Sequence, residues 1–204
     1  MKKDMKNFVA FTFGYTAVGK STIAQKIAKI SNTEIFHSAV IRKEMNLTPK
    51  TLEEADKFFD YRNNLRSDVD RKVYQNLSEN AENSLKNGKS VVLDAGYFFS
   101  WQRQMVYEKA RQLKSEVFII KLKCDDENEI KRRLANRKEN FGTSPLNETP
   151  SWNTYLATKQ ITEPLEEDNF GGLEISILEY NTTKKELSFL KKSPFSENAD
   201  QIKE

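Results

Sequence analysis

The chain has 204 residues, of which 37% are hydrophobic and 31% are charged, and its formal net charge at pH 7 is +3. This length is that of one domain, or of one domain with a small lid, and the apolar content is sufficient for a buried core. No apolar run approaches the roughly 20 residues that a membrane-spanning helix needs, which excludes such a helix.

Strands and helices alternate along the first half of the chain. Residues 8–13 form an apolar run that predicts a strand, and apolar residues at 23, 24, 27, 28 and 30 predict a helix that begins at Lys20. Residues 33–37 predict a second strand and residues 39–45 a short helix. The apolar repeat over 51–87 predicts a largely helical segment, which Asn87 and Gly88 end.

The alternation continues in the second half. Residues 91–94 predict a short buried strand, Ser100 a helix N-cap, and residues 117–123 a further strand. A helix over 125–140, a loop over 143–150, a helix from 151 to near Pro164 and a last strand over 174–180 follow. We therefore expect a doubly wound α/β fold with a parallel sheet, in one domain of residues 1–193, and a disordered tail over 194–204.

The most informative motif lies between the first strand and the first helix. Residues 14–21 fit the pattern G-x-x-x-x-G-K-[ST] of a phosphate-binding loop, or P-loop. Glycines let the backbone turn its N–H groups toward a polyphosphate, and the helix N-terminus adds partial positive charge. Lys20 supplies a cation for the β- and γ-phosphates, and the Ser21 hydroxyl is placed to coordinate Mg²⁺.

The motif and its context predict that ATP and Mg²⁺ are the cofactors. The alternative is a strand–turn–helix whose glycines serve only the turn. The predicted nucleotide-binding residues are Gly14, Tyr15, Thr16, Ala17, Val18, Gly19, Lys20, Ser21 and Thr22.

With strand, loop and helix in this order, the chain resembles the small P-loop kinases of the polynucleotide-kinase and zeta-toxin-like group, over about residues 7–165. The stretches 14–22, 38–43, 91–95 and 133–137 carry the resemblance. It implies a nucleotide-kinase-like P-loop NTPase fold with a short helical lid at about 138–150. It also implies transfer of the γ-phosphate of Mg·ATP to a hydroxyl.

One position departs from the pattern of this group. The second strand of its members typically ends in Asp-x-x-Arg, whose carboxylate takes the proton of the acceptor and whose arginine meets an acceptor phosphate. Here the arginine falls on Arg42, but the acid falls on Ala39, and a methyl group cannot accept a proton. The resemblance therefore implies substrate binding by Arg42 while leaving the catalytic base open.

Asp94 is the candidate for the missing carboxylate. It ends the third strand, where open α/β sheets bind ligands, and from there it could orient or deprotonate a hydroxyl. The alternatives are that Asp94 only caps the turn at Ala95 and Gly96, and that His37, the sole histidine, is the replacement base.

Two arginines precede the predicted lid. Arg133 and Arg137 lie four residues apart, on one helical face. The resemblance implies that they neutralise charge on the transferred γ-phosphoryl group, as catalytic residues beside Lys20 and Asp94. The alternative is a solvated face that pairs with Glu129 or Glu139.

The loop itself also differs from the Gly-x-Pro-Gly-Ser-Gly-Lys of the group. Thr16, Ala17 and Val18 replace its small flexible residues, which predicts a stiffer cradle. The sequence has no Asn-Lys-x-Asp segment, which argues against a regulatory GTPase.

Two functions remain open at this stage. The first is an ATP-dependent phosphotransferase, with a small molecule or a nucleotide as acceptor, and a toxin-like or RNA-end kinase would use the same chemistry. The second is a nucleotide-binding protein without phosphotransfer, for which Ala39 argues.

Interspersed acids and bases give no indication of extended nucleic-acid binding. The single cysteine, Cys124, fits a reducing compartment, so we expect a cytoplasmic protein without a membrane partner.

Overall fold

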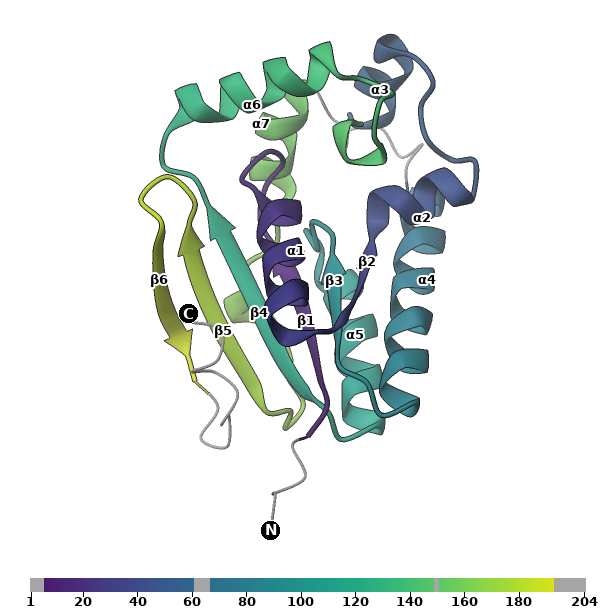
Figure 1. Ribbon diagram of the computed structural model, residues 1–204, viewed down its shortest axis with the longest axis vertical. Helices are drawn as coiled ribbons and strands as arrows, with labels where there is room; N and C mark the ends of the chain where they lie inside the picture. Colours follow the sequence, from purple (N-terminus) through teal and green to yellow (C-terminus); the bar gives the residue numbers. More distant parts are fainter. Residues whose placement is uncertain (1–5, 61–66, 149–150, 193–204) are drawn as a thin grey trace.

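A six-stranded sheet forms the centre of the protein in a computed structural model, which describes residues 6–60, 67–148 and 151–192 (Figure 1). The strands lie in the order β2-β3-β1-β4-β5-β6, and all neighbours except β5 and β6 are parallel. This arrangement confirms the predicted doubly wound α/β fold. The strands are β1 (Phe8–Phe13), β2 (Glu34–His37), β3 (Val91–Asp94), β4 (Glu116–Lys123), β5 (Ile175–Asn181) and β6 (Glu186–Lys191).

Strand β6 was not predicted from the sequence. It runs antiparallel to β5, and a turn closed by a hydrogen bond from the Lys185 N–H to the Asn181 carbonyl oxygen (2.8 Å) joins the two strands. Most of its residues are exposed, so it lacks the apolar run that indicates a buried strand. Leu187 and Phe189 nevertheless pack against the core.

Helices cover both faces of the sheet. No helix in the described ranges is both long enough and apolar enough to cross a bilayer. The helices are α1 (Lys20–Ser31), α2 (Ser38–Glu44), α3 (Leu52–Phe58), α4 (Ser67–Lys86), α5 (Ser100–Gln112), α6 (Glu127–Glu139) and α7 (Trp152–Ile161), with the 3-10 turns η2 (Pro145–Asn147) and η3 (Leu165–Glu167).

Two helix boundaries differ from the prediction. The segment over 51–87 contains two helices, α3 and α4, and residues 61–66 between them lie outside the described residues. Helix α5 starts at Ser100 itself, and the N-cap is Phe99, whose N–H donates to Gln102 Oε1 (3.1 Å). The predicted tail over 194–204 and residues 149–150 of the predicted lid also lie outside the described residues.

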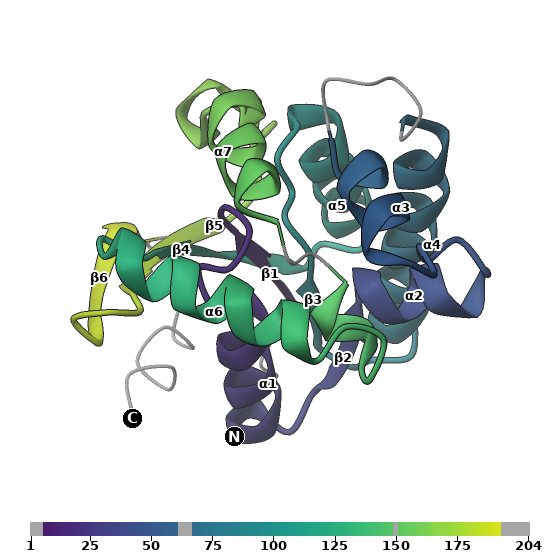
Figure 2. The same ribbon diagram turned by 90° about the horizontal axis from the view of Figure 1, so that it is seen from above.

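The side chains of β1 alternate between two apolar clusters. Val9, Phe11 and Phe13 pack with α4 and α5, whereas Ala10 packs with α1 and α6. Figure 2 accordingly shows α1 and α6 on one side of the sheet and α4 and α5 on the other. Because helices cover both faces of the sheet, we expect a ligand to bind at the carboxyl ends of the parallel strands.

Candidate active site

The loop between β1 and α1 turns at the two glycines of the P-loop motif. Gly14 and Gly19 have φ angles of +147° and +103°, which residues with a Cβ atom rarely adopt. A Cβ atom on Gly14 would also lie 2.5 Å from the Leu122 carbonyl oxygen, so this position has no room for a side chain. The loop is supported by α7, because the Thr16 N–H donates to Thr158 Oγ1 (3.2 Å).

Ala17 occupies a strained position of the loop. Its φ angle is +64°, in the left-handed region, and it is 2% exposed. This is the position at which the resembling kinases have their additional glycine. A left-handed conformation costs a residue with a Cβ atom about 1–2 kcal/mol, so the chain retains the loop geometry at an energetic cost.

Lys20 folds back onto the loop. Its Nζ donates to the carbonyl oxygens of Gly14 (2.9 Å) and Tyr15 (2.6 Å). Burial lowers the pKa of Lys20 to about 7; nearby Asp94 opposes this shift, and Arg137 adds to it. A polyphosphate would restore the charged form of this lysine by supplying negative charge.

Asp94 is held at the end of β3 by two neighbouring strands. Its Oδ2 lies 2.7 Å from His37 Nδ1 on β2, and its Oδ1 accepts a long hydrogen bond from Thr12 Oγ1 (3.4 Å) on β1. The following turn is secured by Thr12, whose hydroxyl contacts both the N–H and the carbonyl oxygen of Ala95 (3.2 and 2.9 Å). His37 is thus a hydrogen-bond partner of Asp94, and the carboxylate is 4% exposed.

Arg42, the predicted substrate-binding arginine, is paired with a carboxylate. It is 2% exposed and forms an ion pair with Glu148, which is 7% exposed and directly follows η2. The charge of its guanidinium group is therefore balanced by a carboxylate within the protein.

Asp94 and Arg42 belong to one cavity beside the P-loop, which we call the inner hollow. Ala39 also lies in its wall, together with the aromatic residues Phe59, Tyr74 and Phe98. The residues that line the inner hollow are Thr16, Ala17, Lys20, Ser21, Ser38, Ala39, Arg42, Phe59, Tyr74, Asp94, Ala95, Gly96, Phe98, Arg137, Leu146 and Glu148.

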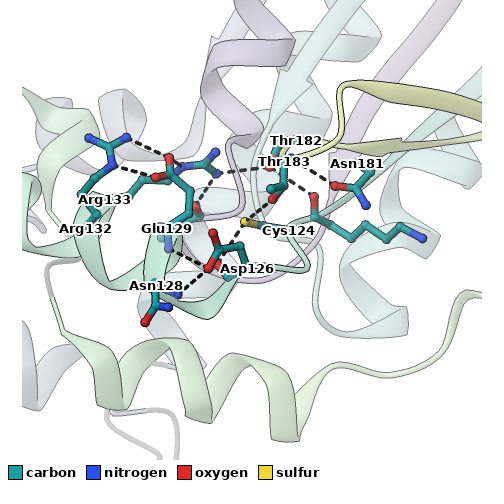
Figure 3. Close-up of polar contacts among 11 residues, drawn as sticks. Cys124, Asp126, Asn128, Glu129, Arg132, Arg133, Asn181, Thr182 and Thr183 are labelled. Atoms are coloured by element: carbon teal, nitrogen blue, oxygen red, sulfur yellow. Dashed lines mark hydrogen bonds and ion pairs between the residues drawn. The ribbon is translucent and has the colours of Figure 1, made fainter.

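A larger cavity, the α1–α6 hollow, lies across the P-loop from the inner hollow. Arg133 crosses its wall: Nε donates to Glu129 Oε1 (2.8 Å), and Nη1 donates to the Ala17 carbonyl oxygen (3.1 Å) and to Thr182 Oγ1 (3.2 Å) (Figure 3). The α1–α6 hollow is lined by Ala17, Gly19, Ser21, Thr22, Ile23, Gln25, Lys26, Glu129, Arg132, Arg133, Asn136, Arg137, Leu146, Asn147, Tyr180, Thr182 and Lys185.

The two predicted arginines of α6 have different surroundings. Arg133 and its neighbour Arg132 both pair with Glu129, and these hydrogen bonds lower the pKa of that carboxyl to about 2. Arg137 lies one turn further on, where Asp94 and Glu148 act on it electrostatically, while burial holds its pKa below the ordinary value. Arg133 therefore faces the α1–α6 hollow, whereas Arg137 lines both hollows.

The shared members show where the two hollows meet. Ala17, Ser21, Arg137 and Leu146 line both of them. The junction thus combines a P-loop hydroxyl with a guanidinium group, directly beside Lys20.

Sequence reasoning missed several residues of this region. Thr12 had a local signal, since it is a polar residue inside an apolar strand just before the P-loop. Glu148 and Thr182 had none, because one follows a turn-rich loop and the other lies in the turn before the unpredicted β6. The aromatic residues Tyr97 and Tyr155 are 0% and 4% exposed and pack in the core.

The fold and the loop together define a P-loop NTPase fold of the small-kinase type. The AAA domain family matches residues 9–158, which is most of the chain, so the protein belongs to this family. This membership confirms the resemblance to small P-loop kinases. No curated protein matches the sequence.

Solved structures share the fold at low sequence identity. A candidate kinase from Chloroflexus aurantiacus is 13% identical with a TM-score of 0.60, covering 89% of this chain and 92% of that one. A sugar kinase from Janibacter sp. is 15% identical with a TM-score of 0.56, covering 86% of each chain. Kti12 from Chaetomium thermophilum, in complex with ADP-AlF3, is 14% identical with a TM-score of 0.57, covering 95% of this chain and 93% of that one.

Proposed function

We propose that the protein is an ATP-dependent phosphotransferase, which moves the γ-phosphate of Mg·ATP to a hydroxyl of a small molecule or of a nucleotide or nucleic-acid end. The observation that carries this proposal is the meeting of two hollows at the P-loop. A nucleotide-binding protein needs one hollow at this loop, whereas a transferase needs a second hollow for its acceptor.

The α1–α6 hollow suits the nucleotide. It is the larger of the two and runs along the first turns of α1, whose N-terminus attracts phosphate. Arg133 and Thr182 would lie beside the nucleoside. The γ-phosphate would reach the junction of the two hollows at Ser21 and Arg137. The ADP-AlF3 bound to Kti12, which has a similar fold, supports a nucleotide at this loop.

The inner hollow suits the acceptor. In the proposed step, the hydroxyl oxygen of the acceptor forms a bond to the γ-phosphorus, while the bond from that phosphorus to the β–γ bridging oxygen breaks. ADP leaves with the electron pair, and the hydroxyl proton passes to the Asp94 carboxylate or to water. Lys20 and Arg137 neutralise the charge that develops on the phosphate oxygens.

The residues present also fit a Mg²⁺ ion. Ser21 and Asp94 line the same hollow and offer a hydroxyl and a carboxylate, the oxygen ligands that this ion takes. When bound there, Mg²⁺ would supply charge neutralisation between the β- and γ-phosphates.

The direct test is ADP formation from Mg·ATP with pooled hydroxyl compounds and nucleic-acid 5′ ends. We expect acceptor-dependent ADP formation in the wild type and a loss of about 10³-fold or more in Lys20→Ala. Lys29→Ala, at an exposed position near the end of the same helix, is the matched control and should keep the wild-type rate. Acceptor-dependent turnover that survives in Lys20→Ala would contradict the proposal.

Ala39 favours a second candidate function, nucleotide binding without phosphotransfer. Its methyl group lies in the wall of the inner hollow, at the position where the resembling kinases carry the catalytic acid. This candidate predicts tight Mg·ATP binding and no ADP formation with any acceptor. We rank phosphotransfer first, because its loose transition state depends mainly on positioning and charge neutralisation.

A further inference from the structure

Glu148 is the residue of the inner hollow that the P-loop chemistry does not explain. It pairs with Arg42, and the pair joins α2 to the lid in a place closed from water. The guanidinium carbon of Arg42 also lies 5.8 and 5.7 Å from the ring centres of Phe58 and Phe59. The pair therefore forms part of the cavity wall.

Each partner of this pair keeps one polar atom unsatisfied. Arg42 Nε and Glu148 Oε2 are buried, and neither has a hydrogen-bond partner among the residues that the structure describes. Buried polar groups are almost always hydrogen-bonded, and a missing bond is costly. Because both residues line the inner hollow, a ligand bound there can supply the missing partners once the two side chains turn toward it.

The two unsatisfied atoms require opposite partners. Arg42 Nε–H needs a hydrogen-bond acceptor, whereas the Oε2 atom of Glu148 needs a donor. A neutral hydroxyl group offers both. The dianion of a phosphate monoester offers only acceptors, and it would lie against a carboxylate.

The charges of the inner hollow lead to the same conclusion. Glu148 neutralises Arg42, and Asp94 adds a second carboxylate. The remaining cations among the described lining residues are Lys20 and Arg137, which the proposed function assigns to the phosphates of ATP. The acceptor end of the hollow therefore offers no cation to a second anion.

We propose that the Arg42–Glu148 pair selects an uncharged acceptor, such as a polyol or a nucleoside. Glu148 Oε2 accepts a hydrogen bond from a second hydroxyl of the acceptor, while Asp94 keeps the role that the proposed function gives it at the reacting hydroxyl. This inference rests on the proposed function and narrows its acceptor class.

The position of Glu148 also gives the acceptor a path to this site. Glu148 lines a third cavity, between the end of α2 and the lid, as well as the inner hollow. A shift of its side chain would join the two. The third cavity is lined by Lys43, Asn46, Thr48, Pro49, Lys50, Phe141, Gly142, Ser144, Pro145 and Glu148.

The test is calorimetric binding to protein saturated with Mg²⁺ and a non-hydrolysable ATP analogue, which fills the P-loop without transferring phosphate. The probes are inorganic phosphate and two matched pairs, glycerol with glycerol 3-phosphate and adenosine with its 3′-monophosphate. In the wild type we expect no phosphorylated probe to bind more tightly than its neutral counterpart. In Glu148→Gln, which releases Arg42 from its counter-charge, we expect inorganic phosphate to bind at least tenfold more tightly.

Two controls define the result. Glu139→Gln, which removes an exposed carboxylate at the end of α6, should leave phosphate binding unchanged. Arg42→Met combined with Glu148→Gln should lose the gained phosphate site. Two results would overturn the inference: tighter binding of the phosphorylated probes by the wild type, or no gain in phosphate affinity in a folded Glu148→Gln. The comparison made with the wild type does not depend on whether the variant folds.

The same titrations separate this inference from the function on which it rests. If the ATP analogue does not bind in the first titration, the proposed function fails and the acceptor inference fails with it. If the analogue binds normally but the phosphate results go against expectation, only the acceptor inference fails.

Discussion

At the scale of single residues, Ala17 shows how strain is stored in the P-loop. Ala17 and Ala24 are both buried, but Ala17 has a left-handed backbone and Ala24 lies inside α1. We expect Ala24→Gly to lower the free energy of unfolding by about 1–2 kcal/mol, through lost helix propensity and a lost methyl contact. Ala17→Gly should cost at least about 1 kcal/mol less, because glycine relieves the left-handed strain. Equal losses in urea denaturation would show that Ala17 is unstrained.

The depressed pKa of Lys20 leads to a prediction about pH. With a pKa of about 7 in the free protein, Lys20 is largely neutral at pH 8, and bound phosphates should restore its proton. Nucleotide binding at pH 8 should therefore take up close to one proton, and affinity should fall by up to about tenfold per pH unit above 7. Calorimetry in two buffers of different ionisation enthalpy measures this uptake. Lys20→Arg, which stays charged, should show none; equal uptake in both proteins would exclude Lys20 as its source.

The residues that could be predicted are those whose role follows from the residues next to them in the sequence. The P-loop octapeptide specifies its own turn, and Asp94 follows an apolar run that ends at the ligand-binding edge. The pairing of Arg42 with Glu148 joins residues 106 positions apart, and no spacing rule reveals such a contact. The same holds for His37, whose role as a partner of Asp94 depends on the register between β2 and β3.

At the scale of elements, α6 is expected to act through its last turn. Arg137 lines the junction of the two hollows, whereas the neighbouring Lys138 is exposed. Arg137→Ala should lower kcat by about 10³-fold, as expected for the loss of a cation on the transferred phosphate, and should change the Kd of Mg·ATP far less. Lys138→Ala should leave both quantities unchanged. Steady-state kinetics with an active acceptor measures the difference, and similar kcat values for the two variants would exclude this role.

Helix α5 is tied to the segment before β5 by a buried ion pair. Arg103 is 0% exposed and binds both carboxylate oxygens of Asp168 (2.6 Å each), and its Nη1 also donates to the Tyr97 carbonyl oxygen (2.9 Å). Arg103→Met leaves a buried carboxylate without its counter-charge, so we expect a loss of about 3–5 kcal/mol in the free energy of unfolding. Lys57→Met, which breaks an exposed pair with Glu53, should cost far less, because solvent screens this pair. Chemical denaturation compares the two, and a similar small loss in both would contradict this account.

Elements were predictable where burial imposes a periodic pattern. The helices α1 and α6 and the strands β1, β3 and β4 bury whole faces or whole runs, and their sequences show it. The strand β6 shows no such run, because most of its residues face water and its pairing with β5 comes from the tertiary structure. This is why Thr182, in the turn between these strands, was missed.

At the scale of the whole molecule, strand order brings the site together. The strand order β2-β3-β1-β4 puts the carboxyl ends of β2, β3 and β1 side by side. Helix α6 lies across this end of the sheet (Figure 1). Alternation of strands and helices predicted a parallel sheet, but alternation alone does not specify which strands are neighbours. The two hollows could not be predicted for the same reason, since they lie between elements that are distant in sequence.

The central claim is that the P-loop binds Mg·ATP, and equilibrium binding of Mg·ATP tests it most directly. We expect saturable binding with one nucleotide per chain, loss of affinity by at least about tenfold in Lys20→Ala, and wild-type affinity in Lys29→Ala. Absence of binding in the wild type, or equal affinity in the wild type and Lys20→Ala, would contradict the account.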